Sequence, residues 1–389
     1  MTQVIVAVII GVAYNLGPRK GIAMVRAAVM PAPHAPIEIR EYPVPELEPG
    51  SILLRTIMSE VCGTDVHLRE GRLGGVPYPI IPGHINVGEI VDLRGELYDV
   101  SGQPLSQGQI VTFLDVHGTC GQCWYCTVAH ASTRCPSRRV YGITYSADDG
   151  LLGGWSEMIY LKPGVKVLPL APGVAPERFM GAGCGLPTAL HAVERADIQL
   201  GDAVVIQGSG PVGLSAAILA QLKGATQVIV IGGPEARLAE AKRIGADAVI
   251  DIGVHGPEER VRMMRELCEG RGPDVTIEAS GNPEAVREGL AMTRDAGTYV
   301  IVGQYTDNGS VAINPHLDIN QKHLDIRGTW GIDFSHMWRA MRVLAKHGPH
   351  YQWERFISHH YTLDEAQQAL DDVARLAVVK AVIEPNSSH

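Results

Sequence analysis

A glycine-rich turn between an apolar strand and a helix constrains this fold more than any other feature of the sequence. The turn is a GxGxxG pattern made of Gly208, Ser209, Gly210, Pro211, Val212 and Gly213. It follows a predicted strand at Val204–Gln207 and opens a predicted helix. Glycines there let the backbone approach a pyrophosphate, which then lies against free N–H groups at the helix N-terminus. The turn therefore predicts a dinucleotide site, and a plain tight turn is the alternative.

The second half of the chain repeats the order strand, turn, helix. Predicted helices at Val212–Lys223 and Glu235–Ile244 alternate with predicted strands at Ala203–Gln207, Val228–Ile231 and Ala248–Ile250. Such alternation predicts a doubly wound parallel sheet with helices on both faces. The sheet is extended by two more predicted strands, Val275–Glu278 and Thr298–Val302.

The first half consists of short β-like segments broken by proline and glycine. Strands are predicted at Ala27–Met30, Ile37–Arg40, Ile52–Ser59 and Ile110–Phe113. After Trp330 the chain carries predicted helices at Ser335–Lys346 and Leu363–Arg375 and a predicted strand at Val378–Ile383. The sequence therefore predicts an extension at residues 1–23, an irregular β-rich domain from residue 24 to about residue 185, and an α/β domain at residues 186–328.

The composition excludes several classes of protein. Hydrophobic residues make up 46% and charged residues 19% of the 389 residues, which is too apolar for a disordered chain. The 33 Lys and Arg against 42 Asp and Glu give a net charge of −9 without a long basic run, so nucleic acid is not an expected partner. The apolar stretch Val4–Ala13 is too short to span a bilayer and lacks the positive flank of an export signal. We expect no membrane association and a reducing, cytoplasmic location.

Four cysteines lie close together in the first half. Cys120, Cys123 and Cys126 form a CxxCxxC run, and Cys135 follows after eight intervening residues. Four thiolates this close satisfy a closed tetrahedral zinc site, which stabilises structure and does no chemistry. Buried free thiols or a redox-active CxxC pair are the alternative. A structural zinc is predicted in this four-cysteine lobe.

Two further cysteines and one histidine indicate a second metal site. Cys62 opens the run CGTDVH, His84 follows Gly83, and Cys184 lies between two glycines. Two thiolates and one imidazole make the three-ligand set of a catalytic zinc whose fourth position is open. His84 by itself would be interpreted as a core histidine, and Cys268 on an amphipathic stretch is predicted to be a core residue.

Together these motifs resemble the zinc-dependent alcohol dehydrogenases of the medium-chain dehydrogenase/reductase superfamily, from Met24 to the end of the chain. The motifs are CGTDVH at Cys62–His67, GHxxxG at Gly83–Gly88, the four-cysteine lobe at Cys120–Cys135, GGWSE at Gly153–Glu157, GCGLPTA at Gly183–Ala189 and GSGPVG at Gly208–Gly213. The resemblance implies a GroES-like catalytic domain at residues 24–185 and 329–389, a Rossmann cofactor domain at residues 186–328, two zinc ions per chain and a nicotinamide dinucleotide. It also implies a homodimer or homotetramer.

The resemblance assigns roles to individual residues. The catalytic zinc would be held by Cys62, His84 and Cys184. Asp65 would hydrogen-bond His84, and Thr64 would take the alcohol proton and pass it through the cofactor ribose to His67 at the surface. A plain surface histidine is the alternative for His67. Cofactor contacts are expected from Gly208, Gly210, Pro211, Val212, Gly213, Gly232, Arg237 and Val302.

Two positions depart from the family pattern. Ile85 stands where relatives carry a glutamate that lies near the metal, which puts ligand exchange in question but not metal binding. The second strand of the sheet ends in Gly232 and Gly233, without the acid that accepts the ribose 2′-hydroxyl in NAD enzymes. Glu235 would repel a 2′-phosphate, and the only near cation, Arg237, can equally be a helix-surface residue. We expect NAD as cofactor, with NADP as the alternative.

The position of the substrate pocket is what the family resemblance implies. Val116 and Trp330 are placed at the pocket, and Tyr145 and Trp155 lie in a loop that could reach it. An apolar pocket without an arginine to bind a carboxylate favours a secondary or cyclic apolar alcohol, which would be oxidised to a ketone or aldehyde. A polyol or threonine-type dehydrogenase is the alternative within this class, and a non-catalytic zinc and dinucleotide binder is the alternative outside it.

Overall fold

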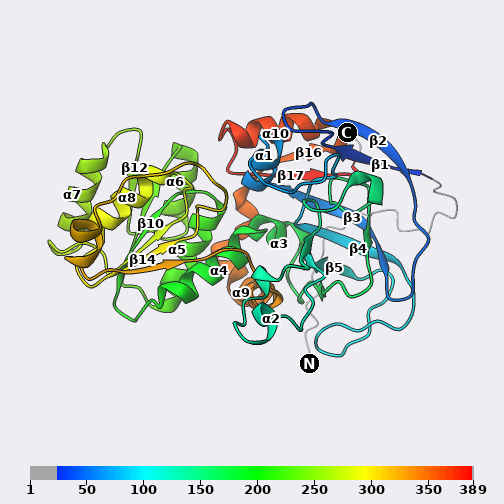
Figure 1. The fold of residues 1–389 in the computed structure, drawn as a ribbon, viewed down its shortest axis with the longest axis horizontal. Coiled ribbons are helices and arrows are strands. Elements are labelled where there is room, and N and C mark those ends of the chain that lie inside the picture. Colours follow the sequence, from blue (N-terminus) through cyan, green and yellow to red (C-terminus); the bar gives the residue numbers. More distant parts are fainter. Residues whose placement is uncertain (1–23, 388–389) are drawn as a thin grey trace, which may run out of the picture.

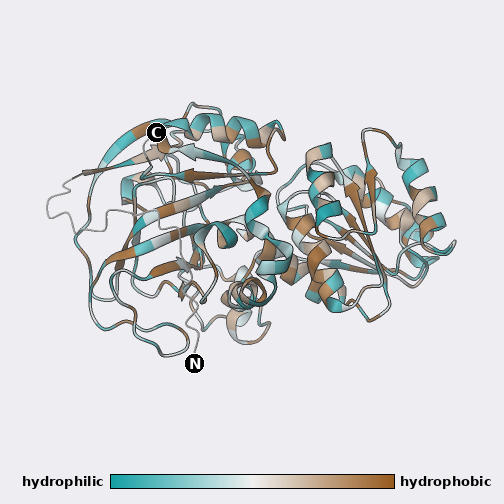
Figure 2. Ribbon diagram, turned by 180° about the vertical axis from the view of Figure 1, so that it is seen from behind, coloured by the Kyte–Doolittle hydropathy of each residue, from teal (hydrophilic) through white to brown (hydrophobic). Residues whose placement is uncertain are grey.

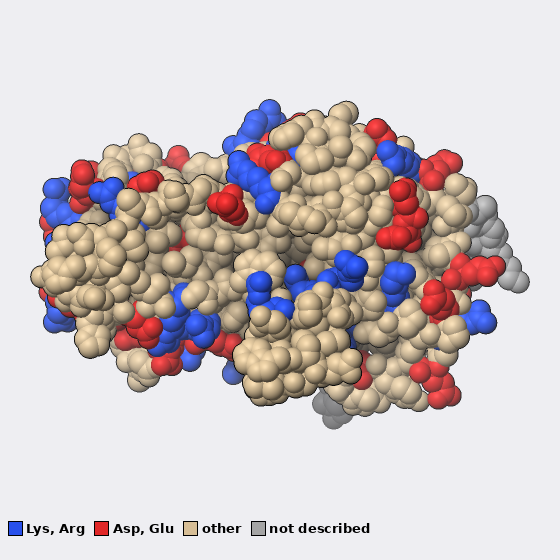
Figure 3. All heavy atoms as spheres, in the orientation of Figure 1, with Lys and Arg blue, Asp and Glu red and all other residues tan. Residues whose placement is uncertain are grey.

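The structure is a computed structural model that describes residues 24–387, so the predicted extension at residues 1–23 lies outside the described residues. Figure 1 shows two parts side by side, one built on a parallel sheet and the other on a mainly antiparallel sheet. Charged side chains of both signs are interspersed over the face shown in Figure 3. No helix within residues 24–387 is long and apolar enough to cross a membrane.

The parallel sheet has the strand order β12, β11, β10, β13, β14, β15, and every neighbouring pair is parallel as predicted. The strands are β10 (Ala203–Gln207), β11 (Gln227–Gly232), β12 (Ala248–Asp251), β13 (Val275–Glu278), β14 (Thr298–Ile301) and β15 (Asp325–Gly328). The order reverses between β10 and β13, and ligands bind at such a reversal in doubly wound sheets. Strand β15 was not predicted, because Asp325 and Arg327 pair at the surface and leave one apolar residue in this short edge strand.

Helices cover both faces of the parallel sheet (Figure 1). They are α4 (Gly185–Ala196), α5 (Pro211–Lys223), α6 (Glu235–Arg243), α7 (Pro257–Leu267) and α8 (Pro283–Met292). Proline starts α5, α7 and α8, where its missing N–H would have no helical partner in any case. In Figure 2 the strands between these helices are coloured as hydrophobic, as a sheet buried on both faces requires.

The second sheet has the order β16, β17, β3, β4, β5, β9, and β8 also pairs with β3. Its strands are β3 (Ile52–Val61), β4 (Asn86–Leu93), β5 (Ile110–Phe113), β8 (Met158–Leu161), β9 (Val167–Pro169), β16 (Ile357–Thr362) and β17 (Lys380–Glu384). Two smaller ribbons are formed by β1 (Met24–Val29) with β2 (Glu38–Pro43) and by β6 (Val116–His117) with β7 (Arg139–Val140). Since β17 pairs with β3, the end of the chain returns to the sheet that the first half builds.

The described chain has five further helices. They are α1 (Gly63–Arg69), α2 (Trp124–Thr127), α3 (Pro176–Ala182), α9 (Phe334–Tyr351) and α10 (Ala366–Ala374). One of them, α9, packs on both α3 and α4. Helix α9 extends beyond its predicted end at Lys346, because Pro349 falls in the last turn and removes only one hydrogen bond there. Helix α10 begins later than predicted, after a 3₁₀ turn at Leu363–Glu365.

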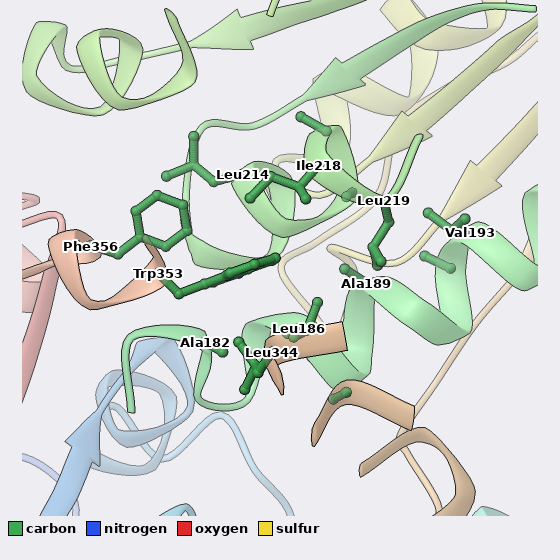
Figure 4. Close-up of a cluster of buried hydrophobic side chains, with 14 of the residues drawn as sticks. Ala182, Leu186, Ala189, Val193, Leu214, Ile218, Leu219, Leu344, Trp353 and Phe356 are labelled. Atoms are coloured by element: carbon green, nitrogen blue, oxygen red, sulfur yellow. The ribbon is translucent and has the colours of Figure 1, made fainter. Parts of the chain in front are cut away.

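One apolar cluster, here named the shared cluster, includes residues from both parts of the molecule. Figure 4 shows Trp353 between α5, which carries Leu214 and Ile218, and α4, which carries Leu186. Trp353 is fully buried, and its Nε1 donates to Ser215 Oγ at 3.4 Å. Because burial of a large apolar side chain stabilises by about 2–3 kcal/mol, this cluster fastens the parallel sheet to the rest of the chain.

Candidate active site

Three separate elements bring together the residues of the predicted catalytic zinc. Cys62 caps α1 just after β3, His84 precedes β4, and Cys184 lies between α3 and α4. One ligand atom of each lies within 4.8 Å of the other two. His84 is buried, and its Nδ1 has no hydrogen-bond partner among the described residues. Two thiolates and an imidazole at this separation fit a zinc ion with an open fourth position.

Burial and neighbouring charges have opposite effects on the pKa of His84. Burial of the ring favours its neutral form, but the hydrogen bond and charge of Cys184, together with Asp115 and Asp65, raise the pKa of His84 to about 10. The hydrogen bond and negative charges around His84 therefore favour a positively charged group at this place. Zinc needs the imidazole in its neutral form, so binding would release this proton.

A capping box at the start of α1 orders the backbone around Cys62. Cys62 Sγ accepts a hydrogen bond from Thr64 N at 3.3 Å, and Asp65 Oδ2 accepts one from Cys62 N at 2.9 Å. No hydrogen bond joins Asp65 to His84 in the part of the chain that the structure describes, and Asp65 Oδ1 is buried without a partner there. The contact of Asp65 with His84 stays a prediction.

The four cysteines of the lobe, Cys120, Cys123, Cys126 and Cys135, also meet in space. Their sulfurs lie within 4.8 Å of one another, with neighbouring pairs 3.5, 3.7 and 3.9 Å apart. Sulfurs bound at about 2.3 Å to a tetrahedral zinc are separated by about 3.8 Å. A hydrogen bond from Cys120 N lowers the pKa of Cys135 to about 6, which favours its thiolate. All seven cysteines are free thiols, and Cys268 is buried as a core residue should be.

A cavity of about 640 Å³ joins the three-ligand set to the dinucleotide turn. From the first part of the chain it is lined by the predicted residues Val116, Thr64 and His67. From the rest of the chain it is lined by Pro211, Val212, Arg237, Val302 and Trp330, all of them predicted site residues. His67 is half-buried, and burial together with the charge of Arg72 lowers its pKa against the opposing effect of Glu70.

Two aromatic residues placed near the pocket by the sequence do not line this cavity. Trp155 is fully buried behind it, and its Nε1 donates to Glu60 O at 3.2 Å. Tyr145 turns away, with its hydroxyl 2.7 Å from His117 Nδ1. Both lie in a loop whose core contacts were not visible in the sequence pattern.

The expectation of a cavity without arginine was wrong, because Arg138 lines it. The guanidinium of Arg138 lies 5.0 Å from the centre of the Trp330 ring, and that of Arg134 lies 4.7 Å from it. Asp115 lines the same cavity, is 6% exposed, and has an Oδ1 without a partner among residues 24–387. Tyr305 stacks on Trp330 with ring centres 6.0 Å apart. None of Asp115, Arg138 and Tyr305 belongs to a motif, so the sequence held no signal for them.

Each glycine of the GxGxxG turn is found at its position for a different steric reason. A side chain at Gly213 would overlap Gly208 O, so this glycine permits close packing of α5 on β10. At Gly208 the backbone has φ +118°, and a Cβ would lie 2.7 Å from Ala279 O. At Gly210 only Arg237 Nη1 comes within 4 Å of a Cβ, at 3.8 Å. That open space at the N-terminus of α5 fits an approaching pyrophosphate.

The geometry at the end of β11 explains why Gly232 stands where NAD enzymes carry an acid. A Cβ on Gly232 would collide with Ser209 Oγ, and that hydroxyl bonds both Gly233 N and Gly233 O at 3.0 Å. An acid at residue 232 is therefore sterically excluded. Asp251 pairs with Gly232 at the end of β12, and its carboxylate lies next to Gly233. Arg237 lines the cavity, and its Nη2 donates to Val378 O at 3.0 Å.

Comparisons with known proteins agree with this geometry. Residues 48–172 match the family described as alcohol dehydrogenase GroES-like domain, and residues 211–346 match the family described as zinc-binding dehydrogenase. The chain is 34% identical to a 5-exo-hydroxycamphor dehydrogenase of Pseudomonas putida, over 92% of this chain and 98% of that protein. It is 27% identical to a sorbitol dehydrogenase of Ovis aries, over 91% of this chain and 96% of that protein.

A solved alcohol dehydrogenase from Thermotoga maritima shares the fold, with a TM-score of 0.88 and 32% identity over 93% of this chain and 100% of that chain. The GroES-like and Rossmann folds predicted from the sequence are thereby confirmed. The chain therefore belongs to the zinc-dependent alcohol dehydrogenases of the medium-chain dehydrogenase/reductase family, enzymes that use NAD(P) and act on CH–OH groups.

Proposed function

We propose that this enzyme oxidises a secondary or cyclic, largely apolar alcohol to the ketone, with NAD as the preferred acceptor. The observation that carries the proposal is the single cavity, because Cys62, His84 and Cys184 open onto the same space as Pro211 and Val212 of the dinucleotide turn. A substrate in that space would touch metal and cofactor together.

The proposed roles of the residues follow from their positions. When bound, zinc acts as a Lewis acid on the substrate oxygen and the nicotinamide accepts the hydride. Thr64, two residues beyond Cys62, takes the alcohol proton, and the half-buried His67, which lines the same cavity, passes it to solvent. Residues of the four-cysteine lobe hold a second zinc that keeps Arg134 and Arg138 against Trp330.

The apolar side chains of the cavity support the proposed substrate class. Val116, Val140, Ile143 and Ile332 line it together with Trp330, and a relative of similar sequence is named for a bicyclic alcohol. Asp115 and Arg138 favour a second candidate, a polyol, because both could bind another hydroxyl. A sorbitol dehydrogenase is among the relatives.

A spectrophotometric screen of nicotinamide reduction tests the proposal. Cyclohexanol, borneol, sorbitol and threonine would each be assayed with NAD and with NADP. We expect turnover with the cyclic alcohols and NAD. Turnover confined to sorbitol or threonine would replace the substrate class with the second candidate, and turnover with NADP alone would overturn the cofactor preference.

The proposed part of His67 predicts a pH effect. Since burial and Arg72 lower the pKa of His67 from 6.5, its neutral, proton-accepting form predominates above that value. The kcat/KM of the wild type is therefore expected to stay level above pH 6.5 and to fall only at lower pH. In His67→Gln we expect a rate reduced by about 100-fold and without this fall. His359→Gln, on exposed β16, is the matched control; a mutant profile like that of the wild type would contradict the role.

The proposed NAD preference rests on Asp251 in place of the missing acid at the end of β11. A carboxylate there accepts a ribose hydroxyl but repels a 2′-phosphate. In Asp251→Asn the ratio of kcat/KM for NADP to that for NAD is expected to rise about tenfold, or about 1.4 kcal/mol. Asp247→Asn, before the start of β12, should leave the ratio unchanged. An equal change in both variants would contradict the assignment.

The architecture supports three further parts of the proposal. We infer that residues 24–185 with 329–389 form the catalytic domain and residues 186–328 the cofactor domain. We infer a homodimer or homotetramer, because Ile326 is exposed on the edge strand β15 and Ile313 and Leu317 are exposed nearby in the chain. We infer a cytoplasmic location, because six of the seven free thiols are proposed metal ligands that a reducing compartment keeps available.

A further inference from the structure

A buried ion pair that no motif predicts lies directly behind the three-ligand set. Glu60 in β3 and Lys380 in β17 are 1% and 2% exposed, and Lys380 Nζ lies 2.7 Å from Glu60 Oε1. Burying two charges costs several kcal/mol each, and apolar residues of similar volume often stabilise a fold as well or better. The stability of the sheet alone does not account for this pair.

The contacts of Glu60 lead to Cys184. Glu60 Oε2 accepts a hydrogen bond from Cys184 N at 2.8 Å, and Glu60 Oε1 lies 3.4 Å from Cys184 Sγ. A side chain at Gly183 would collide with both Glu60 and Lys380, so the backbone before Cys184 is wrapped closely around the pair. The φ of +46° at Gly183 is part of the same turn.

Glu60 lies opposite Ile85, the residue that stands where relatives carry an acid after the zinc histidine. Glu60 N donates to Ile85 O at 3.0 Å, so these two residues face each other across β3 and the start of β4. Ile85 belongs to the shared cluster and contributes no charge. The only carboxylate that touches the ligand Cys184 in the described chain thus comes from the opposite strand.

We propose that Glu60 and Lys380 are a positioning pair that holds Cys184 in place for the catalytic zinc. The carboxylate fixes the Cys184 backbone through its N–H. By itself it would repel the thiolate 3.4 Å away, and Lys380 offsets that repulsion with a positive charge on the same carboxylate. The inference rests on the proposed zinc site of Cys62, His84 and Cys184.

Competition with a chelator tests the pair without measuring turnover. Glu60→Gln keeps the size of the side chain and an acceptor for Cys184 N but leaves Lys380 without its partner charge. We expect the more weakly held of the two zinc ions to be lost at about tenfold lower chelator concentration. In protein loaded with Co²⁺ we expect a weaker sulfur-to-metal charge-transfer band. Glu89→Gln, which breaks the 2.5 Å pair with Arg55 on the neighbouring strand, is the matched control and should change neither result.

A double variant separates positioning from folding. Glu60→Met combined with Lys380→Met removes both charges at similar volume, so the melting temperature should be kept. The proposal expects this variant also to lose the weaker zinc ion more readily. It is overturned if both the single and the double variant resist the chelator like the wild type, or if Glu89→Gln weakens zinc equally. A wild type that binds only one zinc ion would instead overturn the proposed catalytic site, and the pair with it.

Discussion

Cys62→Ala is expected to lower kcat/KM for any alcohol by about 10⁴-fold or more while the chain keeps one zinc ion. Cys62 is one of only three predicted ligands at the open site, and removing it leaves His84 and Cys184, too few for a stable zinc. Loss of the metal removes the Lewis acid, which is worth several kcal/mol of barrier at about 1.4 kcal/mol per tenfold. Zinc content by elemental analysis and initial rates on the same preparation measure both effects.

Cys268→Ala is the matched control for this experiment. Cys268 is buried and belongs to neither metal group, so its variant should retain two zinc ions and the wild-type rate. Unchanged turnover in Cys62→Ala would remove the proposed catalytic site. Loss of both zinc ions would show that the two metal groups depend on each other, contrary to their separation in the structure.

Cys126→Ser is expected to act on stability and on substrate binding. It takes one of four sulfurs from the lobe, and structural zinc sites supply a large part of the folding free energy of their surroundings. We expect the free energy of unfolding to fall by about 5 kcal/mol and the melting temperature by about 10 °C. Because Arg134 and Arg138 come from the chain around Cys135 and lie over Trp330, KM should rise more than kcat falls.

The separate response of KM and kcat distinguishes this effect from general unfolding. Ser132→Ala lies in the same lobe and removes no ligand, so it should leave melting temperature and KM unchanged. If Cys126→Ser kept both zinc ions, the structural site would be wrong. If kcat fell in proportion while KM stayed constant, the proposed link from the lobe to Trp330 would be wrong.

Much of the fold could be predicted because its signals are local. The bounds of β5, β10 and β13 agree with the predicted ranges, since each is a short run of mainly apolar residues. Of the strands that were not predicted, β15 and β16 have largely polar or exposed side chains, and their pairing comes from neighbouring strands. Propensity carries no record of such a partner.

Some residues of the candidate site could be predicted from the sequence, and others could not. The proposed metal ligands and the glycine-rich turn could be proposed from the sequence because their residue types and spacing follow from the chemistry of zinc and pyrophosphate. Glu60 could not, because a single acid in an apolar strand gains its meaning only from Lys380 at the far end of the chain. Asp115 and Arg138 could not be predicted either. Each is a polar residue outside any motif, and only the folded chain places it in the lining of the cavity.

The shared cluster limits how this enzyme can be recombined. Trp353 and Phe356 belong to the C-terminal segment, which returns to the part built on the mainly antiparallel sheet. Trp353 nevertheless lies between α4 and α5 of the parallel-sheet part. A chimera that exchanged residues 186–328 for the matching piece of another dehydrogenase would inherit a foreign surface opposite Trp353. Cofactor preference is therefore better altered by substitutions at the end of β11 and β12 than by grafting the whole domain, unless the stretch at residues 353–356 is grafted with it.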